Sequence, residues 1–222
     1  MHRSLLALAL TTGLLGGPVA AWAGDSPLAA GLNLGTPGVG ADLQLQLSNG
    51  LTLRGDADWL SFSHNTTPSN IHYSGRLKST TVGAFIDWHP LGGPLLVSGG
   101  AYFGPRRITL TATPTSNVTV GGASLTPAQL GTLSGEAKFS GAEPFAALGW
   151  DNTFTGKSWG FRALAGVAFS ASPKVTLTST GGTLSSSPTL APTLLSEQNS
   201  IQQNVRNWRY FPVLQIGVTH RF

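Results

Sequence analysis

Three aspartates in the first third of the chain occupy positions in which they could bind a cation. Asp42 precedes the pair Asn49-Gly50, and Asp56 and Asp58 follow it. An Asn-Gly pair tolerates the positive φ angles of a two-residue hairpin, so the flanking segments should pair with residue numbers that sum to about 99. This pairing brings Asp42 close to Asp56 and Asp58. Three carboxylates in one patch must be protonated, attract arginine or bind a cation.

Charged and apolar residues alternate along much of the chain. Most of the other acidic residues and several of the arginines occupy every second position, with apolar residues between them. Successive side chains of a strand point to opposite faces, so each such segment has one polar face and one apolar face. The charged residues on the polar face are Asp42, Arg54, Asp56, Asp58, Asp87, Glu143, Asp151, Arg162 and Arg221. We expect a lumen or solute-binding set made of Asp42, Arg54, Asp56, Asp58, Glu143 and Arg162, in which the two arginines are the internal partners of the carboxylates.

The segment that ends at Phe222 indicates which elements carry these side chains. Over about fifteen residues its even positions are mostly apolar and its odd positions mostly polar, which is typical of a strand in a transmembrane barrel. Seven more segments alternate in a similar way. The sequence therefore predicts an all-β fold, an eight-stranded antiparallel transmembrane β-barrel with long extracellular loops. The predicted strands cover residues 28–34, 39–47, 51–62, 76–89, 95–109, 138–151, 158–170 and 207–222.

The predicted connections differ in length in a regular way. Those near residues 36, 49, 92 and 154 are short, and those near 68, 122 and 188 are long. Bacterial outer-membrane barrels have short periplasmic turns and long extracellular loops, so the long connections should lie outside, with the turn near 36 as a short external exception. A helical turn is expected at Thr126-Pro127, because proline suits the first helical position. A short helix is expected from Pro192.

Both ends of the chain carry features of an exported barrel. A basic start, an apolar stretch over residues 5–15 and the sequence Ala21-Trp22-Ala23 predict a cleaved signal peptide at residues 1–23 and a barrel at residues 24–222. The positions Gln215, Gly217, His220 and Phe222 look like the C-terminal signal that the barrel-assembly machinery recognises. We therefore expect export and insertion into a bacterial outer membrane.

Composition narrows the class of protein. Only 10% of the residues are charged, against about 25% in soluble domains. Cysteine is absent, which excludes disulfides and thiolate metal sites. The formal net charge is +4, but the bases are scattered, so nucleic acid is not an expected partner. No segment after the signal offers the roughly twenty apolar residues of a membrane helix.

Large aromatic residues are placed as membrane anchors would be. Amphipathic rings collect at the two interfaces of a bilayer. The expected girdle consists of Trp59, Trp88, Trp150, Trp159, Trp208 and Phe222. The alternative is a soluble β-sandwich with buried tryptophans. Pro144 and Pro212 count against a closed barrel, because proline cannot donate to a ladder, and we expect local bulges at both.

Two further groups of polar residues suggest other kinds of site. Ser61, Ser63, His64 and His72 fall near the predicted outer mouth, but their spacing matches no catalytic pattern, and two histidines without a third ligand make a weak metal site. We therefore expect no enzymatic activity, no metal and no cofactor. Pairing around the turn near 92 should place Arg76 opposite Arg107, with Lys78 beside them, on the lipid-facing side. These three bases should bind the phosphates of lipopolysaccharide, unless they form an ordinary solvated strand end.

Several short motifs resemble a known family. Residues 143–150 (EPFAALGW) and 172–177 (SPKVTL), with residues 35–38, 87–90 and 209–213, are similar to the CarO-like branch of small outer-membrane barrels, related broadly to the OmpW and OmpA types. The resemblance implies eight strands and an association with uptake of basic amino acids such as ornithine and with carbapenem susceptibility.

The expected function is therefore that of a porin-like narrow channel or uptake protein for small cationic solutes in a Gram-negative outer membrane. Two alternatives remain open. One is a closed barrel that acts through lipopolysaccharide or through its loops. The other is passage of apolar molecules into the bilayer, which follows from the OmpW relationship alone.

Overall fold

The computed structural model describes residues 26–67 and 71–222. The predicted signal peptide, residues 1–23, lies outside the described residues. The described chain is built almost entirely from antiparallel strands, with two helices, as the alternating sequence pattern predicts. Among these residues, no helix is both long and apolar enough to cross a bilayer.

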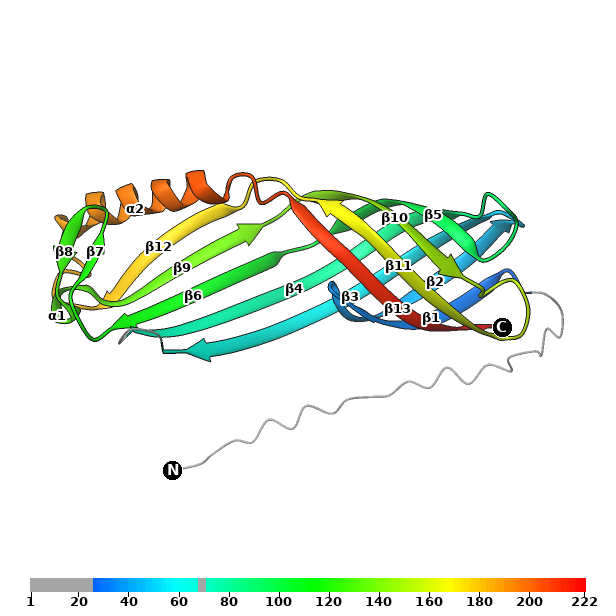
Figure 1. The fold of residues 1–222 in the computed structure, drawn as a ribbon, viewed down its shortest axis with the longest axis horizontal. Helices are drawn as coiled ribbons and strands as arrows, with labels where there is room; N and C mark the ends of the chain where they lie inside the picture. Colours follow the sequence, from blue (N-terminus) through cyan, green and yellow to red (C-terminus); the bar gives the residue numbers. More distant parts are fainter. Residues whose placement is uncertain (1–25, 68–70) are drawn as a thin grey trace, which may run out of the picture.

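Eight strands form a closed ring at one end of the molecule (Figure 1). Each strand pairs antiparallel with the next, and pairing between β4 and β5 closes the circle. The all-β prediction is therefore confirmed, and so is the number of strands in the ring. The strands of the ring, in spatial order, are β1 (Leu28–Gly35), β2 (Gly38–Ser48), β3 (Leu51–Thr66), β4 (Ile71–Trp88), β5 (Leu95–Phe103), β10 (Ala142–Asp151), β11 (Trp159–Phe169) and β13 (Tyr210–Arg221).

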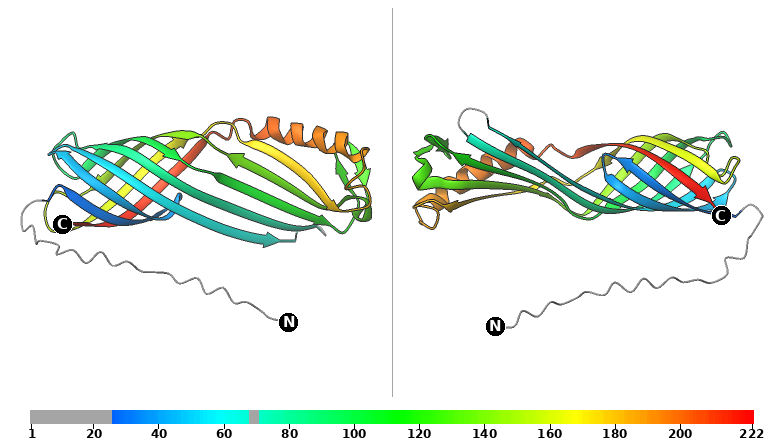
Figure 2. Two further views of the ribbon diagram at one scale, coloured as in Figure 1. Left: turned by 180° about the vertical axis from the view of Figure 1, so that it is seen from behind. Right: turned by 90° about the horizontal axis from the view of Figure 1, so that it is seen from below.

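Beyond the ring the sheet continues as an open extension, which we call the outer sheet (Figure 2). It consists of the far ends of β3 and β4, followed by β6 (Arg106–Pro114), β9 (Gly131–Phe139) and β12 (Lys174–Gly181). The complete sheet has eleven strands, so the prediction of a plain eight-stranded barrel with long loops is wrong in this part. Much of the expected loop regions near 122 and 188 is strand or helix, and on either side of residue 68 the described chain is strand up to Thr66 and from Ile71.

Smaller elements cover the far end of the outer sheet (Figure 1). A hairpin of β7 (Val118–Val120) and β8 (Ala123–Leu125) leads into α1 (Pro127–Leu130). The helical turn predicted at Thr126-Pro127 is confirmed, with a capping box in which Thr126 and Gln129 satisfy each other's backbone N–H groups. The second predicted helix is α2 (Leu190–Val205), which begins two residues before Pro192.

Helix α2 covers the free edge of the outer sheet. The side-chain Oε1 atoms of Gln198 and Gln202, one helical turn apart, accept hydrogen bonds from the backbone N–H groups of Leu177 (3.1 Å) and Val175 (2.9 Å) on β12. Gln202 Nε2 also donates to the carbonyl of Pro173 at 2.7 Å. An uncovered edge strand presents a template for pairing with other chains. The two glutamines remove that template from β12.

The two prolines do not form the bulges expected from the sequence. The register of β10 with β5 is unbroken through Pro144, and that of β13 with β11 is unbroken through Pro212. On their other sides the ladders begin only at Phe145 and Gln215. Each proline therefore lies where its strand has a partner on one side only, so the missing N–H interrupts no ladder.

The outside of the ring carries a continuous set of exposed apolar side chains. The alternation predicts a lipid-facing position for seven apolar residues, namely Leu43, Leu45, Val82, Ile86, Val97, Val167 and Ile216. Six of them are exposed, and Val167 is half-buried. A soluble protein would not leave so much apolar area in water. The exposed six are Leu43, Leu45, Val82, Ile86, Val97 and Ile216.

This belt predicts how the protein behaves in solution. Without its signal segment it should fold only in detergent or lipid, and the folded form should resist SDS until it is heated, because the closed ladder leaves few backbone groups open to denaturant. Electrophoresis of heated and unheated samples measures this directly. A monodisperse, folded protein in buffer without detergent would contradict the assignment.

Candidate functional site

The inner side chains of β5 and β6 show how the interior is layered. From the turn end upward the inward residues are Leu96, Ser98, Tyr102 and Arg106, followed by Ile108 in the outer sheet. Ser98 belongs to a charged network, Tyr102 to an aromatic layer and Arg106 to an ion pair above that layer. The interior therefore changes from polar to aromatic to charged along the axis of the ring.

The aromatic layer fills the middle of the ring. Phe85, Tyr102 and Phe145 meet edge to face, with ring centroids 4.9, 5.2 and 5.3 Å apart. All three are buried, and Phe211 packs against them. Such edge-to-face contacts add to the stability gained from burial alone. The layer thus forms a buried apolar cluster between the charged groups below it and the Arg106 ion pair above it.

Arg54 is the centre of the charged network below that layer. Its Nε donates to Asp87 at 2.7 Å, its Nη1 to Asp56 at 3.1 Å and its Nη2 to Ser98 at 3.2 Å. The guanidinium carbon lies 4.2 Å from the centre of the Phe85 ring, a cation–π distance. Arg54 is completely buried, so its charge depends on these partners.

Arg162 forms a second buried ion pair on the opposite side. Its two Nη atoms donate to the two oxygens of Asp42 at 2.8 and 2.7 Å, the bidentate arrangement that suits guanidinium and carboxylate. Gln44 also donates to Asp42, at 3.0 Å. Asp151 lies 4.0 Å from Arg162 and accepts hydrogen bonds from the backbone and hydroxyl of Thr153.

The expected cluster of three aspartates is present, and its members differ in their partners. Asp42 lies directly opposite Asp56, and Asp58 lies opposite Gly40. A Cβ atom at Gly40 would collide with the Asp58 carboxylate, so glycine makes room for it there. Both carboxylate oxygens of Asp58 are buried and have no hydrogen-bond donor among the described residues. Asp58 is therefore the carboxylate that could accept a cationic solute.

Glu143 is paired with an arginine that the sequence analysis missed. Arg106 Nη1 lies 3.0 Å from Glu143 Oε2, and the Arg106 guanidinium stacks 3.8 Å from the centre of the Phe211 ring. Arg106 lies an even number of residues after Ser98 and Tyr102, so the alternation places all three side chains on the same, inward face of the sheet. Arg221 is only half-buried and lies at the turn end, where its Nη2 donates to the carbonyl of Gly156.

The six expected girdle residues all present exposed rings. His220 stands between two of them, with ring centroids 4.8 Å from Trp159 and 5.5 Å from Phe222. The histidine thus takes the place of an aromatic residue in the terminal strand. Trp208 differs from the others because it precedes β13 and lines the cavity below α2. The others are Trp59, Trp88 and Trp150.

The polar residues weighed as catalytic or metal-binding candidates lie on the exposed ends of β3 and β4. His72 Nδ1 is 3.1 Å from Thr67 Oγ1. Ser63 pairs in register with Arg76, and His64 with Gly75. None of these contacts, within the part of the chain that the structure describes, joins a serine to a histidine and an acid, and the absence of enzymatic activity stays a prediction.

Hollows lie beside both the ring and the outer sheet. A cavity of about 640 Å³ lies between the apolar inner face of the outer sheet and α2, lined by residues such as Ile108, Leu133 and Ile201. A smaller polar hollow of about 330 Å³ opens at the turn end beside Thr52 and Asp151. The third, of about 700 Å³, lies against the wall of the ring.

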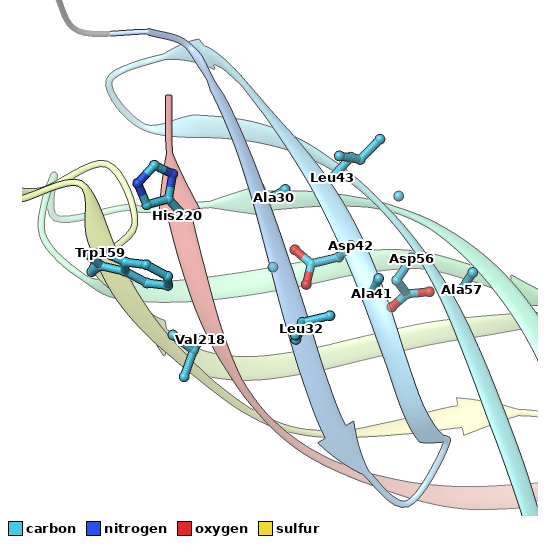
Figure 3. Close-up of a pocket in the computed structure, with 12 residues that line it drawn as sticks. Ala30, Leu32, Ala41, Asp42, Leu43, Asp56, Ala57, Trp159, Val218 and His220 are labelled. Atoms are coloured by element: carbon cyan, nitrogen blue, oxygen red, sulfur yellow. The ribbon is translucent and has the colours of Figure 1, made fainter. Parts of the chain in front are cut away.

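Figure 3 shows this third hollow in close-up. Its lining is mostly apolar, with the small side chains of Ala30, Ala41 and Ala57 between Leu32 and Leu43. These residues belong to the exposed, apolar side of the wall, while Asp42 and Asp56 of the same strands are buried. The wall therefore separates an apolar outer surface from the charged interior within the thickness of one strand.

Comparison with solved structures identifies proteins that have a similar fold. No protein-family model matches the chain, and no curated protein does. Among solved structures, Acinetobacter baumannii CarO aligns with a TM-score of 0.61 and 20% identity over 88% of this chain and 98% of that one. A. baumannii CarO2 aligns with a TM-score of 0.59 and 21% identity over 89% of this chain and 99% of that one. The similarity to the CarO fold expected from the short motifs is confirmed, and the chain has the fold of an outer-membrane barrel.

Proposed function

We propose that this protein is an outer-membrane barrel that passes small cationic solutes through a narrow lumen, and that the described conformation is closed. The solute crosses without chemical change. Basic amino acids such as ornithine, lysine and arginine are the proposed cargo. Export from the cytoplasm and insertion by the barrel-assembly machinery through β13 belong to the same proposal, which the fold and the exposed apolar belt support.

The balance of charge in the interior carries this proposal. Nine charged side chains are buried among the described residues, six carboxylates and three guanidinium groups. The acids are Asp42, Asp56, Asp58, Asp87, Glu143 and Asp151, and the bases are Arg54, Arg106 and Arg162. An excess of one sign between low-dielectric walls concentrates ions of the other sign. A solute with an ammonium or guanidinium group suits the acids that the arginines leave unpaired.

A closed structural barrel is the second candidate, and the aromatic layer favours it. Phe85, Tyr102 and Phe145 form a buried cluster inside the ring, and both Arg54 and Arg162 are paired with carboxylates. An eight-stranded ring leaves an interior that side chains can nearly fill. Under this alternative the charges only stabilise the fold, and no solute crosses.

Replacing Asp58 by asparagine separates the two candidates. Because Asp58 has no ion-pair partner among the described residues, Asp58→Asn leaves no arginine unpaired and removes an isolated buried charge, so it should not lower the free energy of unfolding. It should nevertheless lower the ratio of lysine flux to glutamate flux. Liposomes that contain refolded protein measure both fluxes, and single-channel recording measures the cation preference.

Asp87→Asn is the matched control, since it makes the same chemical change in the same interior. Asp87 accepts hydrogen bonds from Arg54 and Ser98, so this variant should be clearly destabilised. Undetectable flux of every amino acid through the wild-type protein would favour the closed barrel.

A further inference from the structure

Four basic residues form a row across four neighbouring strands. Lys78 of β4 lies opposite Arg107 of β6, Arg107 lies opposite Lys138 of β9, and Lys138 lies opposite Lys174 of β12. All four are exposed. They share a face with the lipid-facing residues of β4, because Lys78 has the same parity as Val82 and Ile86. We call Lys78, Arg107, Lys138 and Lys174 the basic row.

The observed register of β4 with β6 differs from the one that we predict from the sequence. Arg107 pairs with Lys78 and not with Arg76, which lies opposite Thr109 one step further out. The pairs that β4 forms with β5 and β6 are centred on the turn near 92, and they are offset by two residues from the expected pair of Arg76 with Arg107. The observed register brings Lys78 into line with Arg107, and the pairings of β6 with β9 and of β9 with β12 add Lys138 and Lys174.

The height of the row matches the outer boundary of a membrane. Lys78 lies ten residues above Trp88, at the turn end of β4. A tilted strand climbs about 2.5 Å per residue, so Lys78 stands about 25 Å above Trp88, which is the height of the apolar band of such barrels. Trp59, an exposed ring that pairs with Thr80, lies just below. The row therefore begins where the apolar surface ends.

The row is electrostatically unfavourable as it stands. Like charges directly opposite each other on neighbouring strands destabilise a sheet, and the row contains three such pairs in succession. Glu136 pairs with Arg107 at 3.2 Å. Among the described residues, Lys78, Lys138 and Lys174 have no carboxylate within ion-pair distance. A ligand with several negative charges would remove this repulsion.

We propose that the basic row binds the phosphate groups of lipopolysaccharide in the outer leaflet. Neighbouring strands are about 4.8 Å apart, so the row is about 14 Å long, and strand tilt carries it through about 9 Å of height. A phosphorylated sugar headgroup presents several phosphates over such a span at this depth. The proposal requires the outer-membrane location proposed above, but it does not require that the lumen conducts.

A titration of refolded protein in neutral detergent with purified lipopolysaccharide tests this. The variant Lys138→Gln with Lys174→Gln removes the two bases that β9 and β12 contribute to the row. Each base near an anionic surface strengthens binding about fivefold, so the pair should weaken binding roughly thirtyfold. The control Lys157→Gln with Arg206→Gln removes two exposed charges outside the row and should leave the affinity unchanged. Resistance to SDS before heating checks that each variant is folded.

Two other ligands identify the chemistry that is recognised. Lipopolysaccharide stripped of its phosphates should bind as weakly to the wild type as the intact lipid binds to the double variant. Phosphatidylglycerol, which has one phosphate, should bind the wild type more weakly than lipopolysaccharide does. Equal affinity of wild type and double variant for lipopolysaccharide would overturn the proposal, and so would equal affinity of the wild type for both lipids. Because no flux is measured, failure here is distinct from failure of the transport proposal.

Discussion

Replacing Arg162 by methionine is expected to lower the free energy of unfolding by about 3 to 5 kcal/mol, the cost of leaving a buried charge without its partner. Arg162 holds both oxygens of Asp42 in a fully buried bidentate pair. Methionine fills a similar volume but donates no hydrogen bond, so Asp42 keeps only the bond from Gln44. Unfolding by urea in a neutral detergent, followed by tryptophan fluorescence, measures the loss.

Two further variants identify the cause of this loss. Arg107→Met breaks the exposed pair with Glu136 and should cost less than about 1 kcal/mol. Adding Asp42→Asn to Arg162→Met removes the unpaired carboxylate and should restore part of the stability. If Arg162→Met unfolds at the same urea concentration as the wild type, the ion pair does not hold the interior together.

Truncating one ring of the aromatic layer is expected to produce the largest change in permeability. Phe145→Ala removes a side chain that packs against both Phe85 and Tyr102. The polar hollow at the turn end lies below this layer, and the cavity under α2 lies above it. The variant should lose about 3 to 5 kcal/mol of stability and should raise the ion current across planar bilayers.

Phe161→Ala is the matched control for this experiment. Phe161 is a phenylalanine of the neighbouring strand β11, but its ring is exposed on the outside of the wall. Its truncation removes the same atoms without opening the interior, so the current should not change. A folded Phe145→Ala protein with no more current than the wild type would favour the closed barrel.

The sequence predicted the ring well because the two-residue rhythm is imposed by the wall itself. A strand between lipid and a filled interior must alternate at every position, and the expected inward residues Asp42, Arg54 and Arg162 are indeed buried. The Asn49-Gly50 turn also fixed the partner of Asp42, with a shift of one residue that comes from a bulge between Gln46 and Ser48. These features depend on local sequence alone.

The outer sheet could not be predicted in the same way. Polar and apolar side chains alternate only weakly in its strands, such as residues 106–114 and 131–139. One face of these strands meets water and the other meets a cavity, so neither face must be as apolar as a surface in contact with lipid. The basic row depends on the register between strands that are distant in the chain, which no single segment contains. The partner of Glu143 was not predicted, because Gly104, with its positive φ angle, and Pro105 interrupt the apolar alternation directly before Arg106.

The two edges of the outer sheet determine how two copies of the protein could pair. The edge of β12 is covered by Gln198 and Gln202, whereas residues 60–66 of β3 pair only with β4 among the described residues. Two copies could join these free β3 edges as an antiparallel ladder only about a two-fold axis that crosses the strands, which turns one copy upside down. Copies inserted in one bilayer all point the same way. A membrane of the proposed kind therefore forbids this dimer, while detergent, in which orientation is not fixed, permits it.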